Sequence, residues 1–412
     1  MTAAPRIATL DTIRGVAVMG ILLMNIVAFA MPEAAYMNPA AWGSQHAIDY
    51  AAWAGNFLLV DGRMRGLFSV LFGASTLLVV ERAEAAGRSG VVTHFSRMAW
   101  LFAFGMAHLY LIWWGDILQH YAVMGMIAFL FLRLEATQLA ALAMPLILFE
   151  ALWMGNATVH AFAVETAAHA AHPSAAALAA YRDLEANFGT PDPRILAHDV
   201  AVHRSGYAAI FANRLPEANW IPWQTFLNLG PETLAYMLLG MAGLKSGMLT
   251  GAWSHRTYRR IAVLGFAIGV PVYGAMTWYV FAQHFSASAL MLTALMLATL
   301  IRPVMIAGWA SLIVLLIRPG GALTTRIAAA GRMAFSNYLL TSLICTTLFY
   351  GYGFGLYGRL TRAELYLVVP AIWAAILLWS KLWLAHFRYG PLEWLWRSLS
   401  RWRLQQMRGA AA

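Results

Sequence analysis

The stretch ATLDTIRGVAVMGILLMNIVAFA, residues 8–30, decides the fold of this chain. It begins with an acid and a base, Asp11 and Arg14, and an apolar run follows them. A run of about 20 apolar residues is long enough to cross a bilayer as a helix. Asn25 is the one amide inside this run and lies beyond its middle. Because polar groups inside a membrane are costly, Asn25 is a candidate site residue.

The composition of the chain extends this interpretation from one helix to the whole protein. Of the 412 residues, 61% are hydrophobic and only 11% are charged, whereas a soluble domain has about 25% charged residues. The 17 Trp and 16 Tyr residues suit aromatic belts at two membrane interfaces. The single cysteine, Cys345, excludes an intrachain disulfide framework. We therefore predict an all-α polytopic membrane protein.

The arginines predict the topology. Ten apolar cores of near-spanning length follow one another along the chain, at residues 13–31, 66–81, 97–114, 116–133, 137–164, 225–244, 261–282, 303–317, 333–351 and 364–386. If these helices cross in alternation, most of the Arg-rich connections fall on one side, and cytoplasmic loops carry such an excess. We expect about ten transmembrane helices with both termini in the cytoplasm. The net charge of +10 follows from this arrangement and does not indicate a nucleic-acid partner.

Segments outside the cores complete the predicted organisation. Residues 48–60 are expected to form a short half-inserted helix before the second core. Residues 287–301 end at Arg302-Pro303, so they are either a kinked extension of the next helix or a re-entrant piece. Further helices are expected over 175–185 and 195–213. The predicted parts are an N-terminal five-helix half, a periplasmic helical cap, a C-terminal five-helix half and a cytoplasmic interfacial amphipathic tail, at 1–165, 166–221, 222–387 and 388–412.

Two polar residues are expected at the same depth in the membrane. Asn25 lies eleven residues after Arg14, and His108 lies eleven residues after Arg97 on a helix that runs the same way. At about 1.5 Å per residue, each separation spans about 16 Å. Asn25 and His108 therefore form a candidate site. Each also has a structural alternative, a hydrogen bond to a neighbouring helix.

Asp116 lies beside this candidate site in the sequence. The segment WWGDILQHY, residues 113–121, makes a tight turn between the third and fourth predicted helices. In such a turn Asp116 can cap the next helix. It can also orient a histidine in an acid–base site if the turn folds inward.

Basic residues at the cytoplasmic ends of the predicted helices form a second candidate feature. Arg14, Arg97 and Arg332 can make an anion pocket, because guanidinium groups bind phosphate oxygens bidentately. Asn337 follows Arg332 on the ninth predicted helix. Plain positive-inside anchoring is the alternative role for these arginines.

The motifs of the chain are specific enough to indicate a family. They are Leu10-Asp11, Arg14-Gly15-Val16-Ala17, Gly20-Ile21-Leu22-Leu23, Asn25-Ile26, Leu71-Phe72-Gly73-Ala74, Gly115-Asp116-Ile117-Leu118, Gly331-Arg332-Met333-Ala334, Asn337-Tyr338-Leu339-Leu340, Cys345-Thr346-Thr347-Leu348-Phe349-Tyr350, and Gly390-Pro391 with Glu393-Trp394-Leu395-Trp396-Arg397. With these motifs the chain resembles, over nearly its whole length, the YeiB family of bacterial inner-membrane proteins, which is a family of unknown function (domain of unknown function 418).

That family is similar in turn to transmembrane acyltransferases, mainly in the first helix with its Asp-x-x-Arg-Gly opening. The acyltransferase-3 group has a histidine at the position of Asn25. The heparan-alpha-glucosaminide N-acetyltransferase has an asparagine there and a histidine eleven residues later, where this chain has Tyr36. Because neither histidine is present here, a mechanism with a first-helix histidine does not carry over, and His108 becomes the candidate for the general base.

The resemblance implies a membrane-embedded acyltransferase that uses cytoplasmic acyl-CoA, such as acetyl-CoA, and an acceptor at the membrane or periplasmic side. His108 would be the general base, oriented by Asp116, and Asn25 or Tyr36 would hydrogen-bond the oxyanion. Arg14, Arg97 and Arg332, with Asn337 nearby, would hold the CoA phosphates. No metal is expected, membrane lipids are expected partners, and Gly- and Ala-rich helices are compatible with a homodimer. The alternatives are a transporter or flippase, and a non-catalytic membrane binding protein.

Overall fold

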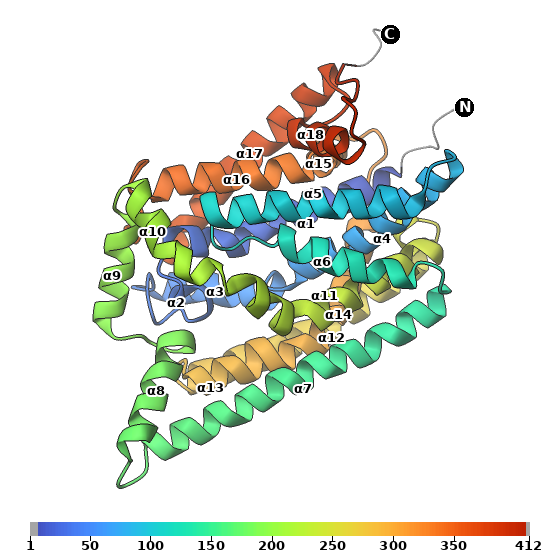
Figure 1. The fold of residues 1–412 in the computed structure, drawn as a ribbon. Helices are drawn as coiled ribbons and strands as arrows, with labels where there is room; N and C mark the ends of the chain where they lie inside the picture. Colours follow the sequence, from blue (N-terminus) through green and yellow to red (C-terminus); the bar gives the residue numbers. More distant parts are fainter. Residues whose placement is uncertain (1–6, 409–412) are drawn as a thin grey trace.

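The computed structural model describes residues 7–408, and these residues form one bundle of helices (Figure 1). Within the described range there is no β-strand, only an isolated bridge between Phe387 and Arg408. The helices at the ten predicted cores are α1 (Ala8–Ala30), α4 (Arg63–Ala85), α5 (Gly90–Leu111), α6 (Leu118–Ala128), α7 (Ala136–Ala168), α11 (Ile221–Lys245), α12 (His255–Ala282), α14 (Ala298–Leu316), α16 (Ala334–Phe349) and α17 (Arg362–His386). The other elements are α2 (Ala34–Met37), α3 (Ala47–Leu59), η1 (Phe129–Phe131), α8 (Ala175–Phe188), α9 (Pro193–His203), α10 (Tyr207–Ala218), η2 (Met248–Thr250), α13 (Ala287–Leu290), η3 (Met291–Leu297), α15 (Ala322–Arg332) and α18 (Pro391–Ser400).

Six of the described helical stretches are long and apolar enough to cross a membrane. They are Ala8–Ala30, Ala47–Ala85, Ala136–Ala168, His255–Ala282, Ala287–Leu316 and Arg362–His386. The prediction of a membrane protein built from apolar helices is therefore supported. A helix also occupies each of the other four predicted cores, in α5, α6 with η1, α11 and α16. These four are shorter or less apolar, so the count of ten crossings stays a prediction.

Two helix crossings are so close that only glycine fits between the backbones. Where α4 crosses α11, a Cβ on Gly73 would lie 2.0 Å from the Met237 carbonyl oxygen, and one on Gly240 would lie 1.8 Å from that of Val70. Where α1 crosses α15, a Cβ on Gly331 would lie 1.9 Å from the Asp11 carbonyl oxygen. Small residues of this kind let membrane helices pack closely. The glycines of the family motifs thus position α1 and α4 at the centre of the bundle.

The segment 287–316 is a continuous helical stretch that includes a π-helix. The π-helical turns are η3, and Pro303 lies inside α14, which continues past it. Of the two alternatives for residues 287–301, the structure therefore has the kinked extension. A π-helix is rare and marks an extra residue in the helical ladder, which the sequence pattern does not reveal.

Three helices, α8, α9 and α10, form the cap at one end of the bundle (Figure 1). The prediction of a helix over 175–185 is confirmed by α8. The prediction of one helix over 195–213 is wrong, because the chain turns at Arg204–Gly206 and separates α9 from α10. Glycine and serine at this turn compete with the helix for backbone conformation.

Helix α18 packs against the first turn of α16, away from the cap. The carboxylate of Glu393 on α18 accepts hydrogen bonds from the backbone N–H groups of Phe335 (2.8 Å) and Ser336 (3.1 Å). These are first-turn N–H groups of α16, which have no partner inside their own helix. Glu393 therefore caps α16 from another helix, and the Gly331 and Gly390 motifs meet in space.

Candidate functional site

His108 and Asp116 form a buried pair where α5 ends. The Nδ1 atom of His108 lies 2.8 Å from Oδ2 of Asp116, and the two side chains are 1% and 0% exposed. The other carboxylate oxygen of Asp116 accepts a 3.0 Å hydrogen bond from the backbone N–H of Gln119, in the first turn of α6. Both roles considered for Asp116 are therefore present, because it caps α6 and contacts the histidine.

Three nitrogen atoms in this region are buried without a protein partner. Among the described residues, His108 Nε2, Trp113 Nε1 and Gln119 Nε2 make no hydrogen bond. The Trp113 ring lies edge-on to His108 at 6.2 Å and stacks on Phe29 of α1 at 3.9 Å, measured between ring centroids. A buried polar group without a partner costs about 1–3 kcal/mol, unless water or a ligand satisfies it. The three nitrogens thus mark a place that suits a ligand oxygen.

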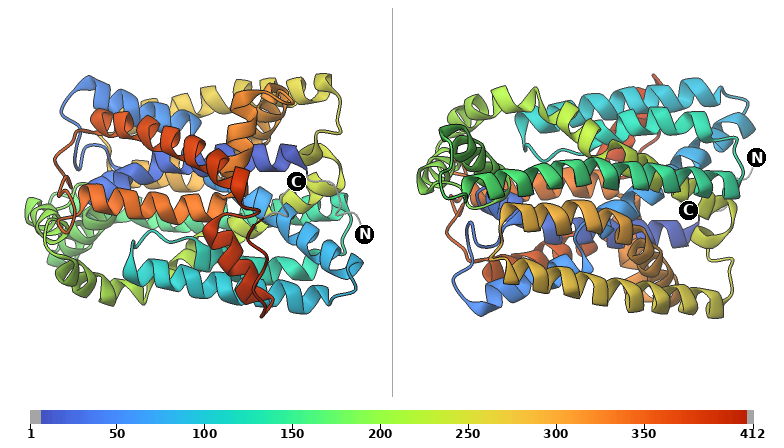
Figure 2. Two further views of the ribbon diagram at one scale, coloured as in Figure 1. Left: turned by 90° about the horizontal axis from the view of Figure 1, so that it is seen from above. Right: turned by 90° about the horizontal axis from the view of Figure 1, so that it is seen from below.

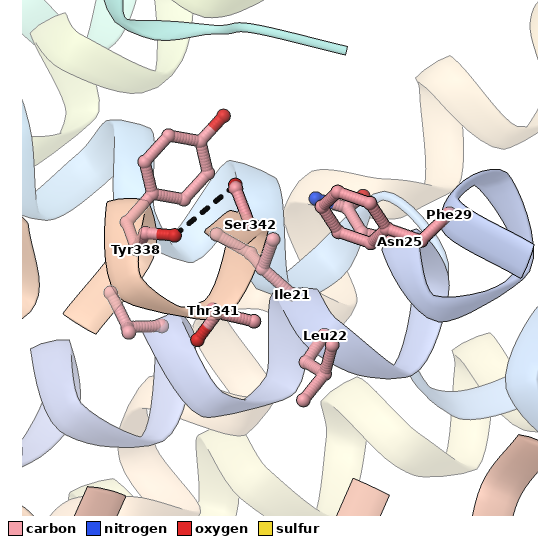
Figure 3. A pocket seen from close by; sticks show the side chains of 8 residues that line it. Ile21, Leu22, Asn25, Phe29, Tyr338, Thr341 and Ser342 are labelled. Carbon is pink, nitrogen blue, oxygen red and sulfur yellow. Dashed lines mark hydrogen bonds between the residues drawn. The ribbon is translucent and has the colours of Figure 1, made fainter. Parts of the chain in front are cut away.

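A small cleft adjoins the pair between α1 and α16 (Figure 3). Asn25 and Phe29 line it from α1, and Tyr338, Thr341 and Ser342 line it from α16. Its volume is about 10 Å³, which is room for roughly one water molecule. An acyl chain can enter only if the lining side chains move.

Tyr338 links this cleft to the histidine. The Tyr338 ring packs against His108 with the centroids 5.3 Å apart, and the same residue lines the cleft with Asn25. Among the described residues, the Asn25 amide makes no hydrogen bond to the protein, so the helix–helix bond considered for it is not observed. Asn25 and His108 are therefore brought to one region, with aromatic rings between them.

The cap covers the α5 end of this site. Tyr207 of α10 donates a 2.8 Å hydrogen bond from its hydroxyl to the Leu111 carbonyl. The hydroxyl of Tyr110 donates to the Asn219 side chain at 2.6 Å. Because Leu111 ends the helix that carries His108, these hydrogen bonds join the cap to the last turn of that helix.

The predicted phosphate-binding residues lie toward the other end of the bundle, and each already contacts protein groups. Arg14 is 3.2 Å from Asp11 and donates to the Ser75 hydroxyl on α4 at 2.8 Å. Arg97 lies over the Trp396 ring of α18 at 3.9 Å, and Arg332 donates to the Arg388 carbonyl at 3.4 Å.

Asn337 is fully engaged within the protein. Its amide nitrogen donates to the Ala330 carbonyl at 3.0 Å and to the Ser380 hydroxyl at 3.1 Å. Its amide oxygen accepts from the Trp379 indole at 2.9 Å. The Asn337 amide therefore connects α15, α16 and α17. Few of its hydrogen-bonding positions remain for a phosphate.

Tyr36 belongs to a different part of the molecule from His108. Burial and the carboxylate of Asp61 raise the pKa of the Tyr36 hydroxyl, and the guanidinium groups of Arg65 and Arg302 lower it. The sequence does not predict the direction of the Tyr36 side chain on the short helix α2. Its position near Asp61, Arg65 and Arg302 was therefore not predictable. Of the two predicted oxyanion donors, only Asn25 lines the cleft beside His108.

A second buried charge cluster was missed at the sequence level. Glu232 of α11 is 1% exposed and pairs with Arg65 of α4 and Arg302 of α14. Its Oε1 atom also accepts a 2.8 Å hydrogen bond from the Tyr236 hydroxyl. The available signal was Glu232 itself, the only acid in the apolar core 225–244. Ionisable residues inside membrane helices are functional candidates by default.

No metal-binding constellation occurs in the described range, because no three His, Cys, Asp or Glu side chains gather there.

The residues that the tight turn contributes beyond Asp116 were also missed. Trp113 and Gln119 both belong to the WWGDILQHY segment, but their unpartnered nitrogens become visible only when burial is known.

Comparison with known proteins places this arrangement among relatives that have no assigned function. Residues 244–403 match a family model described as a protein of unknown function (DUF418). The chain is 33% identical to the uncharacterized protein YeiB of Escherichia coli (strain K12), over 96% of each chain. It is 31% identical to the uncharacterized protein YxaH of Bacillus subtilis (strain 168), over 95% of this chain and 94% of that protein. No solved structure matches. The chain belongs to the YeiB family.

Proposed function

We propose that the protein is an acyltransferase of the bacterial inner membrane, with about ten crossings and both termini in the cytoplasm. It would transfer an acyl group from cytoplasmic acyl-CoA to an acceptor at the membrane or periplasmic side. The observation that carries the proposal is the buried His108–Asp116 pair, with a 2.8 Å contact on one ring nitrogen and no protein partner on the other. A histidine oriented in this way is a common general base.

The proposed chemistry begins at His108. With Nδ1–H donated to Asp116, Nε2 carries a lone pair that accepts the proton of an acceptor hydroxyl or amine. The acceptor oxygen or nitrogen then bonds to the thioester carbonyl carbon, and the carbonyl oxygen becomes an oxyanion. When the carbon–sulfur bond breaks, the CoA thiolate takes the proton back from the imidazolium. Asp116 stabilises that imidazolium throughout.

Trp113 and Asn25 are the proposed donors to the oxyanion. The Trp113 ring is held by its stack on Phe29, so its N–H is fixed before substrate binds. Donors that are fixed in advance stabilise developing charge without reorganisation. The amide of Asn25, which lines the cleft, is the second donor. The CoA phosphates would lie toward Arg14, Arg97 and Arg332 at the far end of α1 and α5.

The proposal is tested with purified full-length protein in proteoliposomes, using acetyl-CoA as donor and bacterial lipid extract or peptidoglycan fragments as acceptors. We expect acceptor-dependent release of free CoA, and a loss of about 10²-fold or more in His108→Ala. His169→Ala, on an exposed histidine at the end of α7, is the matched control and should keep its rate. A His108→Ala protein at full rate would refute the assignment of the base.

A transporter or flippase is the second candidate, favoured by the buried Arg65–Glu232–Arg302 cluster. Charged residues inside membrane helices often mark a substrate or ion path. Ligand binding separates the two candidates, because a ligand that binds the native state raises thermal stability. If acetyl-CoA neither shifts the unfolding temperature nor loses its thioester, the acyltransferase proposal fails and the transporter remains.

A further inference from the structure

The last described residues form a fixed hook after α18. Residues 401–408, here called the C-terminal hook, fold back on the end of α17 through the Phe387–Arg408 bridge. The Trp394 indole donates a 2.6 Å hydrogen bond to the Gln405 carbonyl, and the Gln405 N–H donates to the Ser398 hydroxyl at 3.1 Å. A chain end held by this many contacts presents its side chains in set directions.

The hook presents two large apolar side chains outward. Trp402 is 82% exposed and Leu404 is 78% exposed. Trp402 also has a φ of +50°, in the left-handed region that bulky residues rarely adopt. Strained conformations of this kind persist only where the surrounding structure enforces them, and they concentrate at functional positions.

The surroundings of these two side chains are strongly basic. The segment from residue 388 to residue 408 contains five arginines, at positions 388, 397, 401, 403 and 408, and one acid. That acid, Glu393, is engaged in capping α16. Burial and the neighbouring guanidinium of Arg88 lower the pKa of Arg401. Like charges crowded in this way are best complemented by anions.

The orientation of α18 suits a surface that lies across the bundle. Figure 2, left, shows α18 running across the bundle, past the ends of α16 and α17, rather than along the long helices. The Trp396 indole fixes it there through a 2.8 Å hydrogen bond to the Arg97 carbonyl on α5. If the long helices cross a membrane, α18 and the C-terminal hook lie along its surface, where Trp and Arg are favoured.

We infer that the C-terminal hook binds anionic phospholipid at the membrane surface. Trp402 and Leu404 enter the boundary between headgroups and acyl chains, and Arg401 and Arg403 bind the lipid phosphates. A free phosphate offers the same oxygens but no apolar layer for the two exposed side chains. The inference does not depend on acyl transfer.

The first experiment asks whether Trp402 touches lipid. Full-length protein is placed in nanodiscs of phosphatidylcholine with phosphatidylglycerol, with or without bromine on the acyl chains near the headgroup. Subtracting the fluorescence of Trp402→Phe from that of the wild type isolates one ring among the 17 tryptophans. We expect brominated lipid to quench this difference signal. An unquenched signal overturns insertion.

The second experiment asks whether the arginines select anionic lipid. Native mass spectrometry measures phosphatidylglycerol retained by the wild type, by Arg401→Gln/Arg403→Gln, and by the control Arg182→Gln/Arg194→Gln on the exposed cap. We expect affinity to fall about five-fold per arginine removed from the hook, with no change in the control. Equal retention in all three proteins overturns the inference. Displacement of the lipid by millimolar inorganic phosphate, together with an unquenched Trp402, also overturns it and assigns the arginines to a soluble phosphate ligand.

Discussion

At the scale of single residues, the proposed site is defined by nitrogens with no protein partner. His108 Nε2 and Trp113 Nε1 are both buried within a few side chains of each other, and each ring is held by a neighbour, Asp116 or Phe29. An indole nitrogen only donates, whereas Nε2 of this histidine accepts when Nδ1–H is donated to Asp116. The two atoms therefore have complementary capacities, one for an oxyanion and one for a proton.

Trp113→Phe removes the donor and keeps the aromatic ring on Phe29. Because one oxyanion donor contributes about 10²–10³-fold to kcat, we expect acyl transfer to fall by about 10²-fold with KM for the donor unchanged. Steady-state kinetics in proteoliposomes measure both constants. Trp114→Phe is the matched control, since Trp114 lies 5.8 Å from Trp113 and has no assigned role. Equal rates in Trp113→Phe and the wild type would exclude Trp113 as donor.

The residues that sequence reasoning could place are those whose direction follows from a short, regular element. Asp116 lies eight positions after His108, and a tight turn brings two such positions together, as the 2.8 Å contact shows. Tyr36 follows the loop after α1, where the spacing of residues does not predict the direction of a side chain. It lies near Asp61 and Arg65 instead. The hydrogen bonds that occupy the Asn337 amide were also not predictable, because its partners come from two other helices, α15 and α17.

At the scale of helices, the crossing of α4 and α11 rests on contact between backbones. Gly73 and Gly240 each face a carbonyl oxygen of the other helix across a gap that no Cβ can enter. The Arg65–Glu232 ion pair joins the same two helices. Close packing and charge pairing therefore hold this crossing together.

Gly240→Ala tests the crossing. The added methyl meets the Val70 carbonyl at 1.8 Å, and overpacking of this kind costs about 1–3 kcal/mol or more. Gly274→Ala on α12 is the control, because nothing lies within 4 Å of its Cβ position. Alanine is favoured over glycine in a helix interior by about 1 kcal/mol, so the control should be neutral or stabilised. Unfolding temperatures in detergent report both changes, and equal shifts would contradict the close crossing.

Glu232→Ala tests the charge cluster that joins α4, α11 and α14. The change leaves the guanidinium groups of Arg65 and Arg302 without their carboxylate, and breaking a buried pair in this way costs about 3–5 kcal/mol. Denaturant unfolding of the purified protein measures the loss. Glu81→Ala, on the exposed face of α4, should change stability little. Similar stability of the two variants would mean that the cluster is open to water.

Apolar runs located the helices well, but their internal breaks were not predictable. Every predicted core coincides with helix, because length and hydropathy determine whether a segment suits a bilayer. The break at Arg204–Gly206 and the π-helix of residues 291–297 lie inside stretches that the residue pattern makes continuous. The number of membrane crossings was also hard to predict from apolar runs. Helices α5 and α11 carry polar residues, which suit a membrane only where neighbouring helices surround them.

At the scale of the whole molecule, the two ends of the bundle differ in character. The cap lies over one end, near His108, whereas α18 with its arginines packs on the first half of α5, away from the cap (Figure 1). The proposed acyl transfer would use both ends, with the donor entering beside the arginines and the acceptor beneath the cap. Contacts that hold the cap are therefore expected to influence activity as well as stability.

One such contact is expected to make the cap sensitive to pH. Glu33 lies just after α1 and is exposed as a residue. Its carboxyl group is surrounded by protein atoms and lies near Glu217, Asp199 and His203 of the cap. Burial and the two neighbouring carboxylates raise the pKa of Glu33 from 4.5 to about 7. The folded state therefore binds more protons than the unfolded state between these values, and stability falls as pH rises through that window.

We expect the unfolding temperature of the wild type to decline from pH 5 to pH 8, and Glu33→Gln to flatten this slope. Thermal unfolding at a series of pH values provides the comparison. Glu364→Gln, in the capping box at the start of α17, is the control and should keep the wild-type slope. A variant of Glu33 with an unchanged slope would assign the pH dependence to other groups.

The hydrogen bonds from the start of α16 to Glu393 have a consequence for biosynthesis. The N–H groups of Phe335 and Ser336 leave the ribosome first, and their acceptor follows 58 and 57 residues later. Until then the start of α16 has no partner for these donors, so α17 must be made and α18 must dock before this end of the bundle is complete. A stop codon before position 393 therefore leaves the start of an already synthesised helix without its acceptor.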